Sequence, residues 1–207
     1  MTKSKLIIYL TGIFVGMLLV SNLIANRVWN IGNIMLPAAV FTFPFVFIVN
    51  DILAEVYGFK QTRNIIILGF VINFIAVCFY MLANILPYPS FIEDTANAYK
   101  IALSTTLRVL IASVSAYFIG GLINAKIMEV MHKKHGEKKF SSRAVLSTLF
   151  GEFADGITFI SIMFIGVLPI QNVLVMMLLQ PLLKTIIEII VLPVTTKVVI
   201  KIKTLPK

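Results

Sequence analysis

The chain has 207 residues, of which 59% are hydrophobic and only 13% are charged, and its formal net charge is +9. A soluble domain of this size must cover much of its surface with polar residues, so this composition excludes a soluble fold and predicts an integral membrane protein. The basic surplus does not indicate nucleic-acid binding, because most of the basic residues flank apolar segments.

Six apolar segments are long enough to cross a hydrocarbon layer of about 30 Å. The first has no small-residue cleavage site, so we expect a retained span and not a signal peptide. Pro87 and Pro89 end the third, and a polar stretch with a short surface helix near residues 95–103 follows. The sequence predicts an all-α, polytopic membrane protein with one transmembrane domain (residues 1–207) and six transmembrane helices at residues 6–26, 37–57, 64–86, 107–125, 144–168 and 172–200.

The distribution of Lys and Arg predicts the orientation of these spans. With the N-terminus inside, 14 of the 18 basic residues fall in inner segments and three in outer segments, the last being Lys184 within a span. We therefore expect both termini in the cytoplasm. The basic loop at residues 126–143 is interpreted as a topology signal, with binding of lipid head groups as the alternative.

Five charged residues lie inside these apolar spans. A charge at the centre of a spanning helix costs about 2.5–3.5 kcal/mol on insertion scales, so these side chains must face one another or a wet cavity. They are the first candidates for a functional site: Asp51, Glu152, Asp155, Lys184 and Glu188.

The spacing of these charges places them in pairs on helix faces. Glu152 and Asp155 are three residues apart, and Lys184 and Glu188 are four apart, so each pair shares a face. One lysine cannot neutralise four acids. Some carboxylates are therefore protonated, or they accept a proton, a cation or a polar substrate. A structural ion pair, such as Lys184 with Asp155, is the alternative for any single pair.

Uncharged polar residues and helix breakers accompany these charges. Ser21, Asn22 and Asn26 lie at one end of the first span, where hydrogen bonding between helices is the alternative to a binding role. Pro44, Pro181 and Pro193 predict interrupted helices, which are common in transporters. Small residues predict close helix packing at two places, Gly12 with Gly16, and Ser113 with Ala116 and Gly120.

The sequence offers little for catalysis or metal binding. Both histidines, His132 and His135, lie in the basic loop, and the single cysteine, Cys78, lies in an apolar run. No Ser/His or Cys/His pair, metal-ligand set or phosphate-binding glycine loop is present at membrane depth. We therefore expect neither an enzyme nor a cofactor.

Several further motifs follow one another in order over nearly the whole chain: Ser21-Asn22, Phe43-Pro44-Phe45-Val46-Phe47, Asp51, Glu55-Val56-Tyr57-Gly58, Arg108, Ala112-Ser113, Ala116-Tyr117, Arg143, Ser147-Thr148-Leu149-Phe150-Gly151, Asp155, Lys184 and Pro193. Together they resemble the signature of the queuosine precursor transporter family, also called the vitamin-uptake-like transporters. Two positions depart from that pattern: Asn124 stands where many members carry an aspartate, and Glu152 stands where an amide is common.

The resemblance implies uptake of a 7-deazaguanine across the inner membrane: the cyano or aminomethyl precursor of queuosine, queuine or queuosine itself. A guanine edge presents N1–H and an exocyclic amine, which match one carboxylate bidentately. We hypothesise that Asp155 or Glu152 takes this edge, and that Ser21 and Asn22 take the carbonyl and ring nitrogens. We further expect contacts from Asn26 and from the aromatic face of Phe45 or Phe150. Asp51, Lys184 and Glu188 would set the charge balance of the site.

Several properties are left open by the residues. Besides the substrate and membrane lipids, partners could include protons or cations and a second copy of the chain. The alternative function is the substrate-binding subunit of an energy-coupling-factor type importer, which needs a separate ATPase. A membrane-embedded enzyme or scaffold is a third class, and it lacks a nucleophile set.

Overall fold

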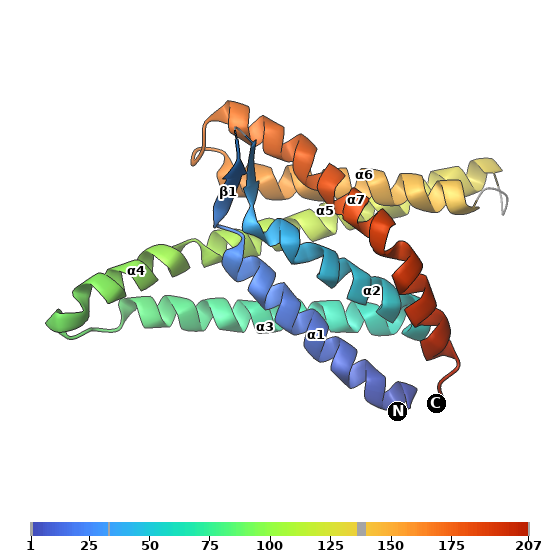
Figure 1. Cartoon of the computed structure of the whole chain (residues 1–207), viewed down its shortest axis with the longest axis horizontal. Helices are drawn as coiled ribbons and strands as arrows, with labels where there is room; N and C mark the ends of the chain where they lie inside the picture. The colour runs from blue at the N-terminus through green and yellow to red at the C-terminus, as the bar shows by residue number, and fades with distance from the viewer. Residues whose placement is uncertain (1, 33, 136–139, 207) are drawn as a thin grey trace. The chain divides into compact units, whose positions relative to one another are not determined.

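The computed structural model describes residues 2–32, 34–135 and 140–206, and helices dominate these residues (Figure 1). The chain divides into two compact units. Unit 1 contains Met1–Val28, Pro37–Leu110 and Ile187–Lys207, and unit 2 contains Trp29–Leu36 and Ile111–Ile186. The elements are α1 (Lys3–Ile24), β1 (Val28–Ile31), β2 (Ile34–Pro37), η1 (Ala38–Phe41), α2 (Phe43–Tyr57), α3 (Phe59–Ile85), η2 (Ser90–Ile92), α4 (Glu93–Ser104), α5 (Thr106–His135), α6 (Phe140–Phe164) and α7 (Ile170–Lys203).

The core of unit 1 forms where α1, α2, α3 and the last part of α7 meet. On α1 the buried residues recur at every fourth position, which is one face of a helix. At Gly69 of α3, an added Cβ would lie 3.0 Å from the Phe14 ring and 3.1 Å from Leu18 Cδ2, so α1 and α3 approach closely there. The core residues are Leu6, Leu10, Phe14, Leu18, Val46, Val49, Ile52, Leu53, Ile65, Ile66, Val199 and Ile202.

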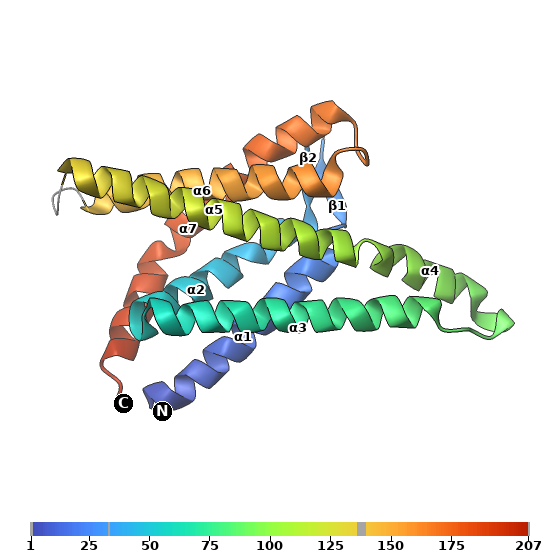
Figure 2. The same ribbon diagram turned by 180° about the vertical axis from the view of Figure 1, so that it is seen from behind.

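The two ends of the chain lie side by side in unit 1 (Figures 1 and 2). The Lys3 backbone N–H donates to the Pro206 carbonyl at 2.9 Å, and the Lys3 Nζ donates to the Lys203 carbonyl at 2.9 Å. The Tyr57 hydroxyl donates to the Lys3 carbonyl at 2.9 Å, and Lys203 pairs with Glu55. These bonds tie the start of α1 and the ends of α2 and α7 together.

A hairpin occupies the segment between α1 and α2. Its strands β1 and β2 are joined at Gly32, whose φ of 58° favours glycine, and the Ala38 N–H donates to the Arg27 carbonyl at 2.7 Å. The predicted second span, residues 37–57, is therefore wrong over its first six residues, because the chain is extended at Pro37 and then forms η1. Pro44 lies in the first turn of α2, where no helical N–H is needed, so it does not interrupt this helix.

Unit 2 consists of the hairpin residues and of the parts of α5, α6 and α7 within Ile111–Ile186. Helices α5 and α6 run alongside each other in both views (Figures 1 and 2). The predicted track on α5 is confirmed at Gly120, where an added Cβ would lie only 2.8 Å from the Gly151 carbonyl oxygen of α6. The predicted packing at Gly12 and Gly16 is not seen within unit 1, since an added Cβ at either would meet none of the described atoms within 4 Å.

The helices support the all-α prediction and correct its boundaries. The helix predicted at residues 95–103 is confirmed as α4, which has no buried residue, and its place at the membrane surface stays a prediction. The expected basic loop is shorter than predicted, because α5 continues to His135 and α6 begins at Phe140; its middle, 136–139, lies outside the described residues. Both Pro181 and Pro193 lie within α7, which continues through them. Within the described residues, four segments are long and apolar enough to cross a membrane: Lys3–Ile24, Lys60–Ile85, Ser90–Asn124 and Ile170–Val191.

Candidate functional site

Helices α6 and α7 bring three of the predicted charged residues together inside unit 2. Lys184 Nζ of α7 donates to Asp155 Oδ2 of α6 at 2.9 Å. One position further along α7, Thr185 Oγ1 lies 2.6 Å from Glu152 Oε2 and donates to it. Glu152, Asp155, Lys184 and Thr185 are called the acid–lysine cluster below.

Burial distinguishes the two carboxylates of this cluster. Glu152 is 7% exposed, and the Lys184 side chain is only 2% exposed, whereas the Asp155 side chain keeps 20% of its surface accessible. Charged groups so deep must be paired and hydrogen-bonded to be tolerated. Lys184 pairs with Asp155, whereas the bond to Glu152 comes from the neutral hydroxyl of Thr185. Asp155 is the more accessible of the two carboxylates.

Glycines next to the acids hold the three helix backbones close together. An added Cβ at Gly120 would lie 2.9 Å from Asp155 Cβ, and one at Gly151 would lie 2.9 Å from Asn124 Cβ. An added Cβ at Gly156 would lie 2.5 Å from Pro181 Cγ on α7. Only glycine permits such approaches. Each acid is therefore next in sequence to a glycine at which two helices approach closely: Glu152 follows Gly151, and Asp155 precedes Gly156.

Two polar residues beside the cluster were not predicted from the sequence. Tyr117 of α5 lies within electrostatic range of Asp155 and one turn from Gly120. Gln180 of α7 lies one turn before Lys184 and is 0% exposed. Neither its Nε2 nor its Oε1 has a hydrogen-bond partner among the described residues. An unpaired buried polar group costs about 1–3 kcal/mol. The i, i+4 spacing from Lys184 was the sequence signal that could have found Gln180.

The polar residues predicted on the first span lie in unit 1 and form bonds there. Ser21 Oγ, fully buried, donates to the Met17 carbonyl at 2.7 Å and hydrogen bonds with Thr42 Oγ1 at 2.8 Å. Asn26 Nδ2 lies 2.9 Å from the Ala102 carbonyl and 2.8 Å from Thr105 Oγ1. Asn22 is buried beside Ser21. For Ser21 and Asn26, these bonds support the helix-joining alternative.

The remaining predicted site residues are Phe45 and Asp51 in unit 1, Phe150 in unit 2, and Glu188. Phe150 of unit 2 is 53% exposed, and in unit 1 Phe45 is 56% exposed and Asp51 is also exposed. The side chain of Glu188 lies outside the described residues. Their predicted roles in substrate binding stay predictions.

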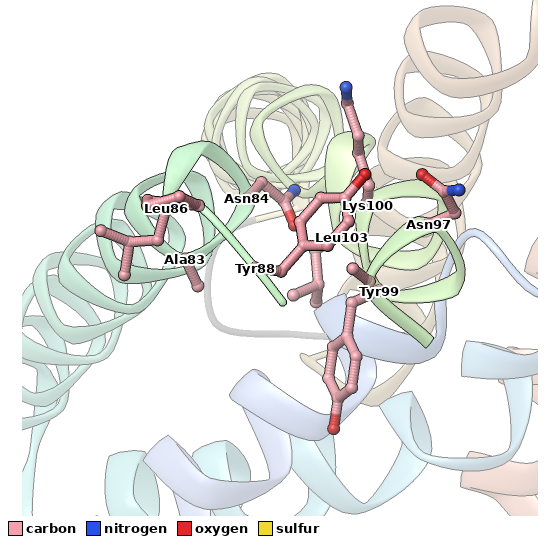
Figure 3. A pocket seen from close by; sticks show the side chains of 10 residues that line it. Ala83, Asn84, Leu86, Tyr88, Asn97, Tyr99, Lys100 and Leu103 are labelled. Carbon is pink, nitrogen blue, oxygen red and sulfur yellow. The ribbon is translucent and has the colours of Figure 1, made fainter. Parts of the chain in front are cut away.

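Unit 1 contains a separate pocket of about 290 Å³ between the end of α3 and α4 (Figure 3). Its lining includes Asn84, Tyr88, Asn97, Tyr99 and Lys100. None of the predicted site residues lines it. Among the described residues, no group of three or more His, Cys, Asp or Glu is arranged to hold a metal ion.

Comparison with known proteins gives the family. A family model described as "Putative vitamin uptake transporter" matches residues 37–198. The chain is 29% identical over 126 residues to a "Probable queuosine precursor transporter" of Haemophilus influenzae, an alignment that covers 59% of this chain and 49% of that protein. The chain thus spans about half the length of this curated relative. No solved structure matches.

The family match covers far more than half of the chain and includes every residue of the acid–lysine cluster. Together with the apolar helices, it identifies a multi-pass membrane protein. The chain belongs to the vitamin uptake transporter family.

Proposed function

We propose that this chain transports a queuosine precursor or salvage base, a 7-deazaguanine, across the inner membrane into the cytoplasm. The observation that carries the proposal is the acid–lysine cluster, in which Lys184 pairs with Asp155 and a second carboxylate, Glu152, accepts from Thr185 inside otherwise apolar helices. An acidic surplus at this depth favours a substrate that donates hydrogen bonds or carries a positive charge. The description of the Haemophilus influenzae relative as a probable queuosine precursor transporter agrees with this substrate class.

Asp155 is the carboxylate best placed to take the guanine edge. Its side chain is the more accessible of the two, and its bond from Lys184 ends on Oδ2 alone. Each carboxylate oxygen has two lone pairs, so both oxygens can still accept a bond from the N1–H and the exocyclic amine. Lys184 then fixes the position of Asp155, and Glu152 provides the negative charge that suits an aminomethyl group.

The first test is ligand-induced stabilisation of the detergent-solubilised chain. A ligand that binds only the folded protein raises its melting temperature by mass action. We expect 7-cyano- and 7-aminomethyl-7-deazaguanine to raise it and adenine to leave it unchanged. A flat response to every deazaguanine would remove the proposed substrate class.

The second test is Asp155→Asn, which keeps the shape of the side chain and removes its charge. An amide offers only one acceptor oxygen to the guanine edge, so we expect uptake to be abolished while folded protein is retained. Uptake is measured with radiolabelled base in proteoliposomes that contain only this chain. Full uptake by Asp155→Asn would refute the assignment of Asp155, and wild-type uptake in these liposomes would exclude dependence on a separate ATPase.

A further inference from the structure

Gln180 is a buried amide that lies beside the acid–lysine cluster. It is fully buried on α7, and the four-residue spacing from Lys184 places the two side chains on one face of the helix. The next residue, Pro181, is the one that Gly156 of α6 approaches most closely. Gln180 therefore shares a helix face with the residue that pairs with Asp155.

The hydrogen-bonding capacity of Gln180 is unused within the described residues. Neither its Nε2 nor its Oε1 has a partner there, whereas Asn50 and Asn73 each show one such atom. Buried polar groups in folded proteins are nearly always paired, and an exception needs an explanation. A packing role would be better filled by Leu or Met, because an apolar side chain leaves no amide unpaired.

We propose that Gln180 contacts the transported base and reads the oxygen of its six-membered ring. This inference rests on the proposed function and names the residue that distinguishes the substrate. In the proposed contact, Gln180 Nε2 donates to the ring carbonyl of the deazaguanine. Its Oε1 accepts from a donor on the neighbouring ring substituent, such as the ammonium of the aminomethyl base.

The two sides of the base then have separate partners. Asp155 accepts from N1–H and the exocyclic amine, and Gln180 lies one turn of α7 from Lys184, the lysine that holds Asp155. The carbonyl is adjacent to N1 on the ring, so a rigid planar base can reach both side chains at once. A base with an amino group in place of the carbonyl would leave Nε2 unpaired, and such a site rejects it strongly.

The test is Gln180→Met, a substitution of similar length and volume. Binding is measured by calorimetry with purified protein and 7-cyano-7-deazaguanine. We expect about tenfold weaker binding or more, because a lost hydrogen bond in a buried site is reflected directly in the dissociation constant. We expect a larger loss of affinity for the aminomethyl base than for the cyano base, since only the aminomethyl base has a donor for Oε1.

The melting temperature of the unliganded protein distinguishes a direct contact between Gln180 and the ligand from a structural role of Gln180. We expect it to be unchanged or higher in Gln180→Met, because the variant removes an unpaired amide. Gln180→Leu is a second variant in case the first does not fold. The matched control is Asn73→Met, which changes a buried amide of α3 in unit 1 and should leave binding unaltered.

A second ligand links the residue to the ring atom. The ligand 2-amino-7-cyano-7-deazapurine lacks the carbonyl. We expect Gln180→Met to bind this ligand as tightly as the wild-type protein does. The proposed role of Gln180 would be overturned if Gln180→Met weakened the binding of both ligands equally. It would also be overturned if this variant had a lower melting temperature and unchanged binding. No response of the wild-type protein to any deazaguanine would instead remove the proposed function itself.

Discussion

Lys184 is the residue on which the stability of the candidate site depends most directly. It is buried and donates to Asp155, and a second carboxylate, Glu152, lies on the same helix as Asp155. Breaking a buried pair by removing one partner leaves an uncompensated charge, which costs about 3–5 kcal/mol. We therefore expect Lys184→Met to lower the stability of the protein by this amount, measured as thermal unfolding in detergent.

The double variant Asp155→Asn/Lys184→Met tests whether the pair itself is the cause. Removing both charges together should cost less than the sum of the two single changes, because no charge of this pair remains buried alone. The exposed pair Lys203–Glu55 is the matched control, and Lys203→Met should change stability by about 1 kcal/mol or less. Equal losses for the buried and exposed lysines would contradict this account.

At the scale of elements, close contacts between helices position the charges. Gly156 stands beside Asp155, and an added Cβ there would lie 2.5 Å from Pro181 Cγ. A rigid proline ring on a helix cannot move away as a flexible side chain can. Gly156→Ala should therefore destabilise the protein by about 1–3 kcal/mol through overpacking and should weaken ligand binding by shifting Asp155. Thermal unfolding with and without ligand measures both effects.

Gly12→Ala is the control for this substitution. An added Cβ at Gly12 meets none of the described atoms within 4 Å, and alanine favours a helix over glycine by about 1 kcal/mol. The same change of residue should thus be neutral or stabilising in α1. If Gly156→Ala were as well tolerated as Gly12→Ala, α6 and α7 would not be in the close contact described.

At the scale of the whole chain, the two termini share one side of unit 1. Lys3 bonds to Lys203 and Pro206, so we expect both ends to face the same side of the membrane. Helix α3 has 27 residues and is about 40 Å long at 1.5 Å per residue. We therefore expect Lys60 at its start and Lys100, which lines the pocket at its other end, to lie on opposite sides of the membrane.

This arrangement predicts a labelling pattern. In a Cys78→Ser background, an impermeant thiol reagent should label Lys100→Cys in intact cells and should label Lys60→Cys only after permeabilisation. The reason is that the inner segments hold most of the basic residues, which orient helices during insertion. Labelling of Lys60→Cys in intact cells would reverse the predicted orientation.

Some features could be predicted from the sequence because they depend on composition and spacing. A run of about twenty apolar residues indicates a helix in a membrane whatever its neighbours are, and the i, i+3 spacing of Glu152 and Asp155 indicates one face. Residues 37–42 were misassigned because a short apolar run fits a strand, a 3-10 helix or an α-helix equally well. The count of six spans, the single transmembrane domain and the cytoplasmic termini stay predictions.

The sequence by itself determined the chemical class of this protein: an apolar chain whose predicted spans contain, away from their ends, four acids and one lysine. Only the tertiary structure decided which groups meet, because contacts between helices depend on how closely their backbones approach. It brought Lys184 to Asp155 and Thr185 to Glu152, bonded Ser21 and Asn26 within unit 1, and left the amide of Gln180 without a partner among the described residues. Spacing along one helix predicts a shared face, but the partner on another helix is fixed by glycines far away in the chain.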